Sequence, residues 1–368
     1  MQAGRVYDSL RGVSIEAAER DNTAVLHADI GKTFAGMIDE GRALDEEIEG
    51  FGQDDAFLSL QAHARLNKSS APCKRKTDMT KCHVTLLSDR AVVRVAGPGA
   101  HAFLQGLITN DIDKAKPGGA IHGGLLTPHG KILFDFFVVP AADGFRLDVP
   151  KAKAAELMQR LGFYRLRAQV EITEDPSFTV AAAWGAAPQL PNGAVAFTDP
   201  RLPGLGQRIL LLAGTDAGDL GCALTTEDKY HAMRVALGVP QGGRDYAFGD
   251  TFPHEAMFDQ LNGVDFKKGC FVGQEVVSRM EHRGTARRRI VGVEGEEPLP
   301  PSGTEITAGS TPIGTLGSMS GRCGLALLRL DRAEEAQATG VPLRAGEVTV
   351  VLRIPAWARI KSTVQVPS

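Results

Sequence analysis

The sequence predicts an α+β protein that ends in a small C-terminal β-barrel. From about residue 86, segments with strand-like alternation are mixed with segments of helical periodicity. After residue 286, short strands are separated by turns rich in Gly and Pro, which is typical of a small barrel. The 368 residues suffice for two or three domains with apolar cores. We expect an α+β region of two lobes at 79–286 and a barrel at 287–368.

Residues 1–78 differ in style from the rest of the chain. The stretch "IGKTFAGMIDEGRALDEEIEGFGQDD" predicts one or two short acidic helices, and "NKSSAPCKRKTD" is typical of a solvated linker. Met79 then opens "MTKCHVTLLSDRAVVRVAG", which alternates like a strand that enters a compact domain, and "RAVVRVAG" within it predicts a strand. We therefore predict that residues 1–78 are an extension, disordered or added by a misassigned start at Met1. A genuine helical arm is the alternative.

The central region predicts alternating helices and strands. "GPGAHAFLQGLITND" predicts a turn followed by a helix with an apolar face of Ala102, Phe103, Leu104, Leu107 and Ile108. "AIHGGLLTPHGKILFDFFVVP" predicts a hairpin that turns at Pro128, His129 and Gly130. "AKAAELMQRLGFYRLRAQV" predicts a helix that passes into a strand, and "VEITEDPSFTVAAAWG" continues the same sheet. "TEDKYHAMRVALGVP" predicts a helix with Thr226 as N-cap, ended by Gly238 and Pro240.

Composition excludes several classes of protein. A net charge of −3 argues against a protein that coats nucleic acid, so we expect no direct nucleic-acid partner. No apolar run approaches the roughly 20 residues of a membrane helix. The five cysteines are far apart and odd in number, which favours a reducing compartment over a disulfide framework. They form no CxxC, so we expect neither a zinc ribbon nor a self-contained iron–sulfur cluster. The N-terminal residues lack a signal peptide's apolar core, so we expect a cytoplasmic protein.

The most informative stretch is "DFKKGCFVGQEVVSRMEHRG", at residues 265–284. Its single cysteine, Cys270, is a nucleophile, a metal ligand, a redox thiol or a small packed residue. Lys267 and Lys268 would favour a thiolate if their charges lay within about 4–6 Å of the sulfur. Glu275 would accept a proton or orient a partner, and the glycines would permit close approach of a ligand or a tight backbone geometry.

Several strings together resemble a known family. "KKGCFVGQE" matches the K-G-C-[FY]-x-G-Q-E pattern of the YgfZ-type folate-binding proteins, relatives of the aminomethyltransferase (T-protein) of the glycine cleavage system. The resemblance continues in "FLQGLITNDI", "GGLLTPHGKILFDFFV" and "YHAMRVALGVPQGGRDY", and in "STPIGTLGS" and "GLALLRL" of the expected barrel. It covers roughly residues 81–360 in the expected order.

The resemblance implies a fold of three lobes around a channel that binds tetrahydrofolate. It also implies a role in assembling, maintaining or repairing iron–sulfur clusters of 4Fe–4S client enzymes, including some that modify tRNA. The expected partners are folate and iron–sulfur client or carrier proteins, in the mitochondrial matrix if the source is eukaryotic. Cys270 is the family's functional thiol, as a redox group or as one ligand of a transient cluster shared with a partner. Its neighbours in the pattern are Lys268, Gly269, Gly273, Gln274 and Glu275.

Two further residues are implied as folate contacts. Asp111 in "LITND" lies where T-protein relatives place a carboxylate that faces folate, whereas the residues alone predict a turn or cap. Arg244 would bind the glutamate tail of folate bidentately, or would form a surface salt bridge. Asp135 in the hairpin is expected to face water, with the channel as the alternative.

A local basic cluster would bind polyglutamate, a client protein or RNA, or would be a solvated strand edge. Its members are Arg279, His282, Arg283, Arg287, Arg288 and Arg289.

Three functions are compatible with these patterns. The first is the folate-dependent iron–sulfur maintenance factor. The second is a folate-dependent aminomethyltransferase or demethylase, although the Cys270 pattern marks the YgfZ branch and not the glycine cleavage enzymes. The third is a folate-binding scaffold without catalytic activity, which the sequence does not separate from the first.

Overall fold

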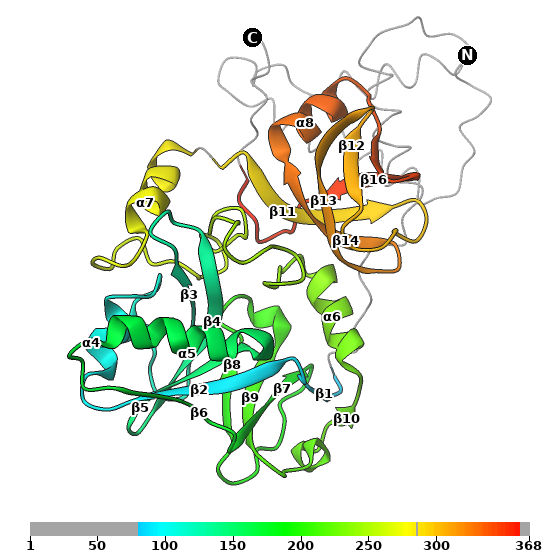
Figure 1. The fold of residues 1–368 in the computed structure, drawn as a ribbon. Helices are drawn as coiled ribbons and strands as arrows, with labels where there is room; N and C mark the ends of the chain where they lie inside the picture. Colours follow the sequence, from blue (N-terminus) through cyan, green and yellow to red (C-terminus); the bar gives the residue numbers. More distant parts are fainter. Residues whose placement is uncertain (1–79, 285, 361–368) are drawn as a thin grey trace, which may run out of the picture. The chain divides into compact units, whose positions relative to one another are not determined.

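The computed structural model describes residues 80–284 and 286–360. The expectations for residues 1–78 and for a start at Met79 lie outside the described residues. Within them, the fold is mixed α and β with a C-terminal barrel, as predicted (Figure 1). No helix of the described segments is long and apolar enough to cross a membrane.

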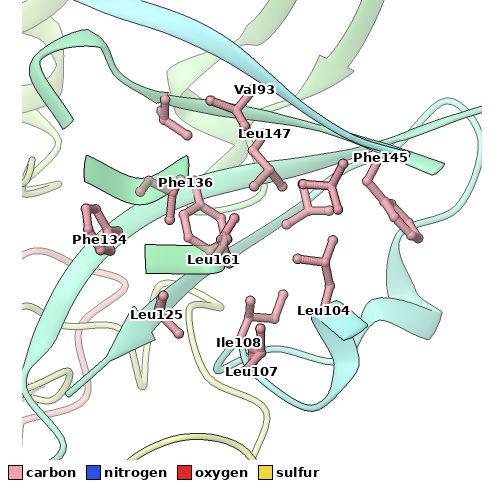
Figure 2. Packing of buried hydrophobic residues seen from close by; sticks show 14 of the residues in the cluster. Val93, Leu104, Leu107, Ile108, Leu125, Phe134, Phe136, Phe145, Leu147 and Leu161 are labelled. Carbon is pink, nitrogen blue, oxygen red and sulfur yellow. The ribbon is translucent and has the colours of Figure 1, made fainter. Parts of the chain in front are cut away.

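The first sheet carries the segments around the candidate site. Its strand order is β3-β4-β5-β2-β6, and every neighbouring pair is antiparallel. Its buried face packs against helices α4 and α5, and Figure 2 shows side chains such as Phe136, Leu147 and Leu161 meeting there. The elements are β2 (Arg90–Ala96), α4 (Ala100–Gln105), β3 (Ile121–Leu126), β4 (Ile132–Ala141), β5 (Gly144–Pro150), α5 (Lys151–Arg165) and β6 (Glu171–Glu174).

The second sheet corrects two predictions about connectivity. Its order is β10-β1-β7-β9-β8, so β6 and β7 belong to different sheets although they were expected to continue one. The alternating stretch after Met79 is likewise divided between the sheets as β1 and β2, and β2 (Arg90–Ala96) confirms the strand expected in "RAVVRVAG". Short turns, at 87–89 and 175–177, redirect the chain in both cases. The elements are β1 (His83–Leu86), β7 (Phe178–Trp184), β8 (Val195–Thr198), β9 (Gln207–Leu212) and β10 (Ala223–Leu224).

A disulfide joins Cys82 to Cys222, with Cα atoms 4.7 Å apart. The two residues directly precede β1 and β10, which pair in parallel. The expectation that the cysteines form no disulfide is therefore wrong for this pair. The sequence did not show it because the two cysteines are 140 residues apart.

The helix expected in "GPGAHAFLQGLITND" is shorter than predicted. Helix α4 ends at Gln105, and Gly106 is its C-cap. Leu107 and Ile108 are buried in the turn that follows, whereas Ala102 is exposed. The hairpin β3–β4, by contrast, turns at residues 127–131 as predicted.

The C-terminal strands form a closed antiparallel barrel, which confirms the predicted barrel. The strand order is β11-β14-β13-β12-β15-β16, and β16 pairs back to β11. Strand β11 begins at Arg288, whereas the domain boundaries given above stay a prediction. A helix not foreseen, α8 (Leu330–Ala338), packs Ala333 and Ala336 into the barrel core. The strands are β11 (Arg288–Gly295), β12 (Glu305–Ala308), β13 (Thr311–Ser320), β14 (Cys323–Arg329), β15 (Leu343–Ala345) and β16 (Val348–Arg353).

Helix α6 (Glu227–Ala236) is joined to the barrel by hydrogen bonds from the two members of a buried ion pair. Thr226 is its N-cap residue, as predicted, although its side chain makes no capping hydrogen bond. Near the helix end, Arg234 contacts Asp245 at 2.6 Å and donates to the hydroxyl of Ser318 on β13 at 2.7 Å. The Asp245 carboxylate also accepts from the backbone N–H of Ser318 at 2.7 Å.

Candidate functional site

Cys270 lies on an exposed loop directly before helix α7 (Gln274–Arg283). Among the described residues it is the free cysteine, and its side chain is exposed to solvent. The next residue, Phe271, is buried in a cluster that contains Phe258 and Val277. The loop therefore presents its thiol to solvent while the adjacent aromatic ring anchors it.

Lys268 does not accompany the thiol at the surface. Its ammonium donates to the backbone carbonyls of Gln105, Ile108 and Asn110 at 2.8, 2.7 and 2.9 Å. The residue is only 7% exposed, and burial lowers the pKa of Lys268 to about 8. Lys267, by contrast, is exposed. The ammonium of Lys268 is therefore committed to backbone carbonyls and does not stand beside the thiol as expected, whereas the expected role of Lys267 stays a prediction.

The "TND" segment, residues 109–111, contacts the segment that leads to Cys270, and the contacts between these two segments are called the seam below. The Thr109 hydroxyl donates to the Gly263 carbonyl at 2.6 Å. The Asn110 amide donates to the carbonyls of His122 and Asn262, each at 2.7 Å. Because Thr109 and Asn110 are buried, these bonds satisfy side-chain donors that water does not reach. The segment and the Cys270 loop are thus held together at several points.

Asp111 acts as a cap, as the alternative from its residue type predicts. Its carboxylate accepts from the backbone N–H of Asp113 at 3.1 Å and from the Gln105 amide at 2.9 Å. It precedes the short 3-10 helix η2 (Ile112–Lys114). Its expected contact with folate stays a prediction.

Gly273 and Gly269, both part of the Cys270 pattern, differ in whether the fold leaves space for a side chain. Gly273 has a φ of +79°, and a Cβ there would lie 2.5 Å from the Thr127 carbonyl oxygen. It is the N-cap of α7 and packs against Gly130 in the turn of the β3–β4 hairpin, beside which α7 lies (Figure 1). At Gly269 a Cβ would meet nothing within 4 Å. Packing therefore explains Gly273 and leaves room at Gly269 for an approaching molecule.

This difference predicts unequal costs for the same substitution. We expect Gly273→Ala to lower the free energy of unfolding by about 2 kcal/mol or more, because it combines a positive φ with a backbone clash. Gly269→Ala is the matched control, for which we expect a change within about 0.5 kcal/mol. Urea unfolding of both variants measures this. Equal losses would show that α7 is not seated on the hairpin turn.

Helix α7 replaces the solvated strand edge considered for part of the basic cluster. Arg279, His282 and Arg283 lie on this helix, and Arg279 contacts Glu275 at 2.9 Å. Both partners of that pair are largely exposed, so it contributes little stability. Gln274 begins the helix.

Arg244 lies as one of its two alternatives predicts, whereas Asp135 lies in different surroundings from those expected. Arg244 is 3.5 Å from Asp89 and 3.9 Å from Glu227, as the salt-bridge alternative predicts. Asp135 does not face water, so that expectation is wrong. One carboxylate oxygen accepts from the Tyr246 hydroxyl at 2.5 Å, and the other is buried without a hydrogen-bond partner among the described residues.

Tyr246 is a residue that the sequence reasoning missed. Burial, together with the nearby Asp135 carboxylate, raises the pKa of Tyr246 well above its ordinary value. The phenol therefore stays a hydrogen-bond donor at all ordinary pH values. The "GGRDY" string contains Tyr246, but its arginine, Arg244, was the residue predicted to contact folate.

Two groups of side chains have ligand atoms close enough together for one metal ion. They are Asp89, Glu227 and His231, and His254, Asp259 and Glu281, within the described ranges. In each group a guanidinium already contacts a carboxylate, Arg244 in the first and Arg289, 2.9 Å from Asp259, in the second. Because arginine supplies the positive charge, we assign no resident metal to either group.

Comparisons with known proteins agree with this architecture. Residues 287–360 match the family model described as the CAF17 C-terminal beta-barrel domain. The human protein named "Iron-sulfur cluster assembly factor IBA57, mitochondrial" is 30% identical over 312 residues, which cover 74% of this chain and 84% of that protein. The mouse protein of that name is 31% identical, covering 66% of this chain and 76% of its own length. The Neurospora crassa homologue is 31% identical, but this chain spans 58% of its length.

A solved structure shows the same fold. The glycine cleavage system aminomethyltransferase T from Bartonella henselae has a TM-score of 0.61 at 16% identity, covering 76% of this chain and 88% of that chain. The expected T-protein-like fold is thereby confirmed, whereas the assignment to the YgfZ-type branch stays a prediction. The chain belongs to the family of the iron–sulfur cluster assembly factors IBA57.

Proposed function

We propose that this protein assists the assembly, maintenance or repair of iron–sulfur clusters in client enzymes, with Cys270 as its functional thiol. The observation that carries the proposal is the exposed free thiol on a loop whose neighbours are fixed by buried contacts. Membership of a family whose named members are iron–sulfur cluster assembly factors supports it. The finer proposal is that its clients are 4Fe–4S enzymes, including some that modify tRNA.

One thiolate does not hold a cluster alone. Iron–sulfur clusters are held mostly by several cysteine thiolates, so the other ligands would come from a client or carrier protein. The open space at Gly269, next to Cys270, suits the close approach of a partner's backbone. Exposed Lys267 beside it would attract an anionic cluster.

We propose tetrahydrofolate, or a derivative, as the small-molecule ligand. The pterin ring presents N–H donors, and the buried unpartnered oxygen of Asp135 is an acceptor that suits them. Asp111 and Arg244 stay candidates for other parts of folate, although both have partners within the chain. Bound folate would supply a one-carbon carrier, and these side chains would orient it.

The compartment is proposed from the relatives. They are named as mitochondrial proteins, which supports the mitochondrial matrix if the source is eukaryotic and the cytoplasm otherwise.

The test combines Cys270→Ser with Arg160→Gln, a control at an exposed position on α5. Tetrahydrofolate binding is measured by calorimetry on the purified proteins, and the activity of a 4Fe–4S enzyme is measured in cells that lack the native gene. We expect all three proteins to bind folate and only Cys270→Ser to lose most client activity, because only it lacks the thiolate ligand.

The other outcomes decide among the alternatives. Full client activity with Cys270→Ser would remove the thiol from the proposed function. Absence of folate binding by the wild type would withdraw the proposed folate contacts and favour a scaffold. Release of a one-carbon group from a folate substrate would favour an aminomethyltransferase or demethylase.

A further inference from the structure

We infer that Lys268 is a positioning residue that clamps the Cys270 loop to the segment carrying Asp111, so that the two move as one unit. The clamp is defined by the Lys268 ammonium and the carbonyl oxygens of Gln105, Ile108 and Asn110. What the unit does for a client or for folate rests on the proposed function, whereas the clamp itself does not.

The three carbonyls form a site that suits an ammonium. Helix α4 ends at Gln105, so carbonyl oxygens at and beyond its last turn lack helical partners. The three donor–acceptor distances lie between 2.7 and 2.9 Å, and an ammonium has three hydrogens to donate. Every hydrogen of Lys268 is thus used, and two of its acceptors belong to the buried residues Ile108 and Asn110.

The rest of the seam explains why removing this one side chain should affect both segments. Asp265, three residues before Lys268, donates its backbone N–H to the Thr109 carbonyl at 2.9 Å. Its carboxylate contacts Lys114 at 2.7 Å, on the Asp111 side of the seam. The contacts of Asp265 lie at the end of the seam that is farther from Cys270 in sequence, whereas the contacts of Lys268 lie at the nearer end. Without Lys268, the three carbonyls would lose their charged hydrogen-bond donor, and the start of the Cys270 loop would lose its link to the Asp111 segment.

The charged groups that face Lys268 predict a distinctive pH dependence. Asp111 and Asp265 favour its ammonium form, but burial outweighs them and lowers the pKa of Lys268 from 10.5 to about 8. If opening of the seam releases Lys268 to solvent, the open state has the higher pKa and takes up a proton between these two values. Opening therefore becomes less favourable as the pH rises through this window. Neutral Lys268 still has two hydrogens to donate.

The experiment is hydrogen–deuterium exchange with mass spectrometry on the full-length protein, without folate or cluster. The variants are Lys268→Met, which keeps the length of the side chain without its donors, and Lys268→Arg, which keeps the charge. Lys267→Met is the control at the adjacent exposed position. Peptides that cover residues 104–112 and 264–274 report the two segments, and barrel peptides from 311–329 report global stability.

For Lys268→Met we expect exchange to speed up by about tenfold or more in both segments, with the barrel unchanged. Lys268→Arg should restore part of the protection, and Lys267→Met should match the wild type. Faster exchange in only one segment, in neither, or equally throughout the barrel would overturn the clamp.

The pH arm separates the clamp from general packing. After correction for the chemical exchange rate, wild-type exchange in both segments should slow between about pH 7 and pH 9.5. Lys268→Met should show no such change, although it keeps Lys267, Cys270, Asp111, Asp265 and Lys114. The same profile in both proteins would assign the effect to another group and overturn the role of Lys268. Neither arm uses a ligand, so failure here leaves the proposed function untouched.

Discussion

Asp245→Ala is expected to lower the free energy of unfolding by about 3–5 kcal/mol, because it leaves a buried guanidinium without its counter-charge. Arg234 is fully buried, and its Nη1 lies 2.6 Å from the Asp245 carboxylate. The same carboxylate accepts from the backbone N–H groups of Gln241 and Ser318 at 2.8 and 2.7 Å. The loss would therefore remove the carboxylate's hydrogen bond to strand β13 as well as unpair a charge, and would leave only the direct bond from Arg234 to the Ser318 hydroxyl.

The matched control is Asp331→Ala, at an ion pair with Arg329 whose side chains are 26% and 39% exposed. We expect its loss to stay within about 1 kcal/mol, because water screens and replaces a surface pair. Urea unfolding monitored by circular dichroism compares the two. Similar small losses would mean that Arg234 gains another partner or water when Asp245 is removed.

Removal of the Cys82–Cys222 disulfide is expected to lower the free energy of unfolding by about 3–5 kcal/mol. The bond closes a sequence separation of 140 residues, and a longer closed loop removes more conformational entropy from the unfolded chain. The disulfide also holds β10, only two residues long, beside β1. Cys82→Ser, Cys222→Ser and the double variant are unfolded in urea without reductant.

The three disulfide variants should lose nearly the same stability, because either single change already breaks the bond. Cys270→Ser serves as the control, since that thiol is exposed and free, and it should match the wild type. Losses that add up between the two single variants would show two independent packed thiols and no cross-link in solution.

Local patterns could predict most strands but not their partners. The stretch from Glu171 to Trp184 alternates like one continuing sheet, yet the chain turns at 175–177 and enters another sheet. The turn is supported by a bond from the Asp175 backbone N–H to the Val92 carbonyl, 2.8 Å long. A contact with a residue so far along the chain leaves no periodic signal in sequence.

The candidate site was predictable in position but not in organisation. Helix α7 was missed because Val277 is its one buried residue, so no apolar periodicity marks it. Lys268 was expected beside the thiol because lysine is rarely buried. Its actual place depends on carbonyls of residues 105–110, which come together only in the fold. The requirement for glycine at position 273 was likewise not predictable, because it comes from contact with the distant hairpin turn at Gly130.

The contacts of Lys268 also determine when the site can form. They join residues 158 to 163 positions apart, whereas strands β3 and β4 are joined by a short turn. Contacts between residues far apart in sequence have a larger entropic cost of loop closure, so they form later than local contacts. During synthesis, the hydrogen bonds between Lys268 and its acceptor carbonyls form only after residue 268 has left the ribosome. We therefore expect the cysteine loop to acquire its shape after the hairpin on which α7 rests.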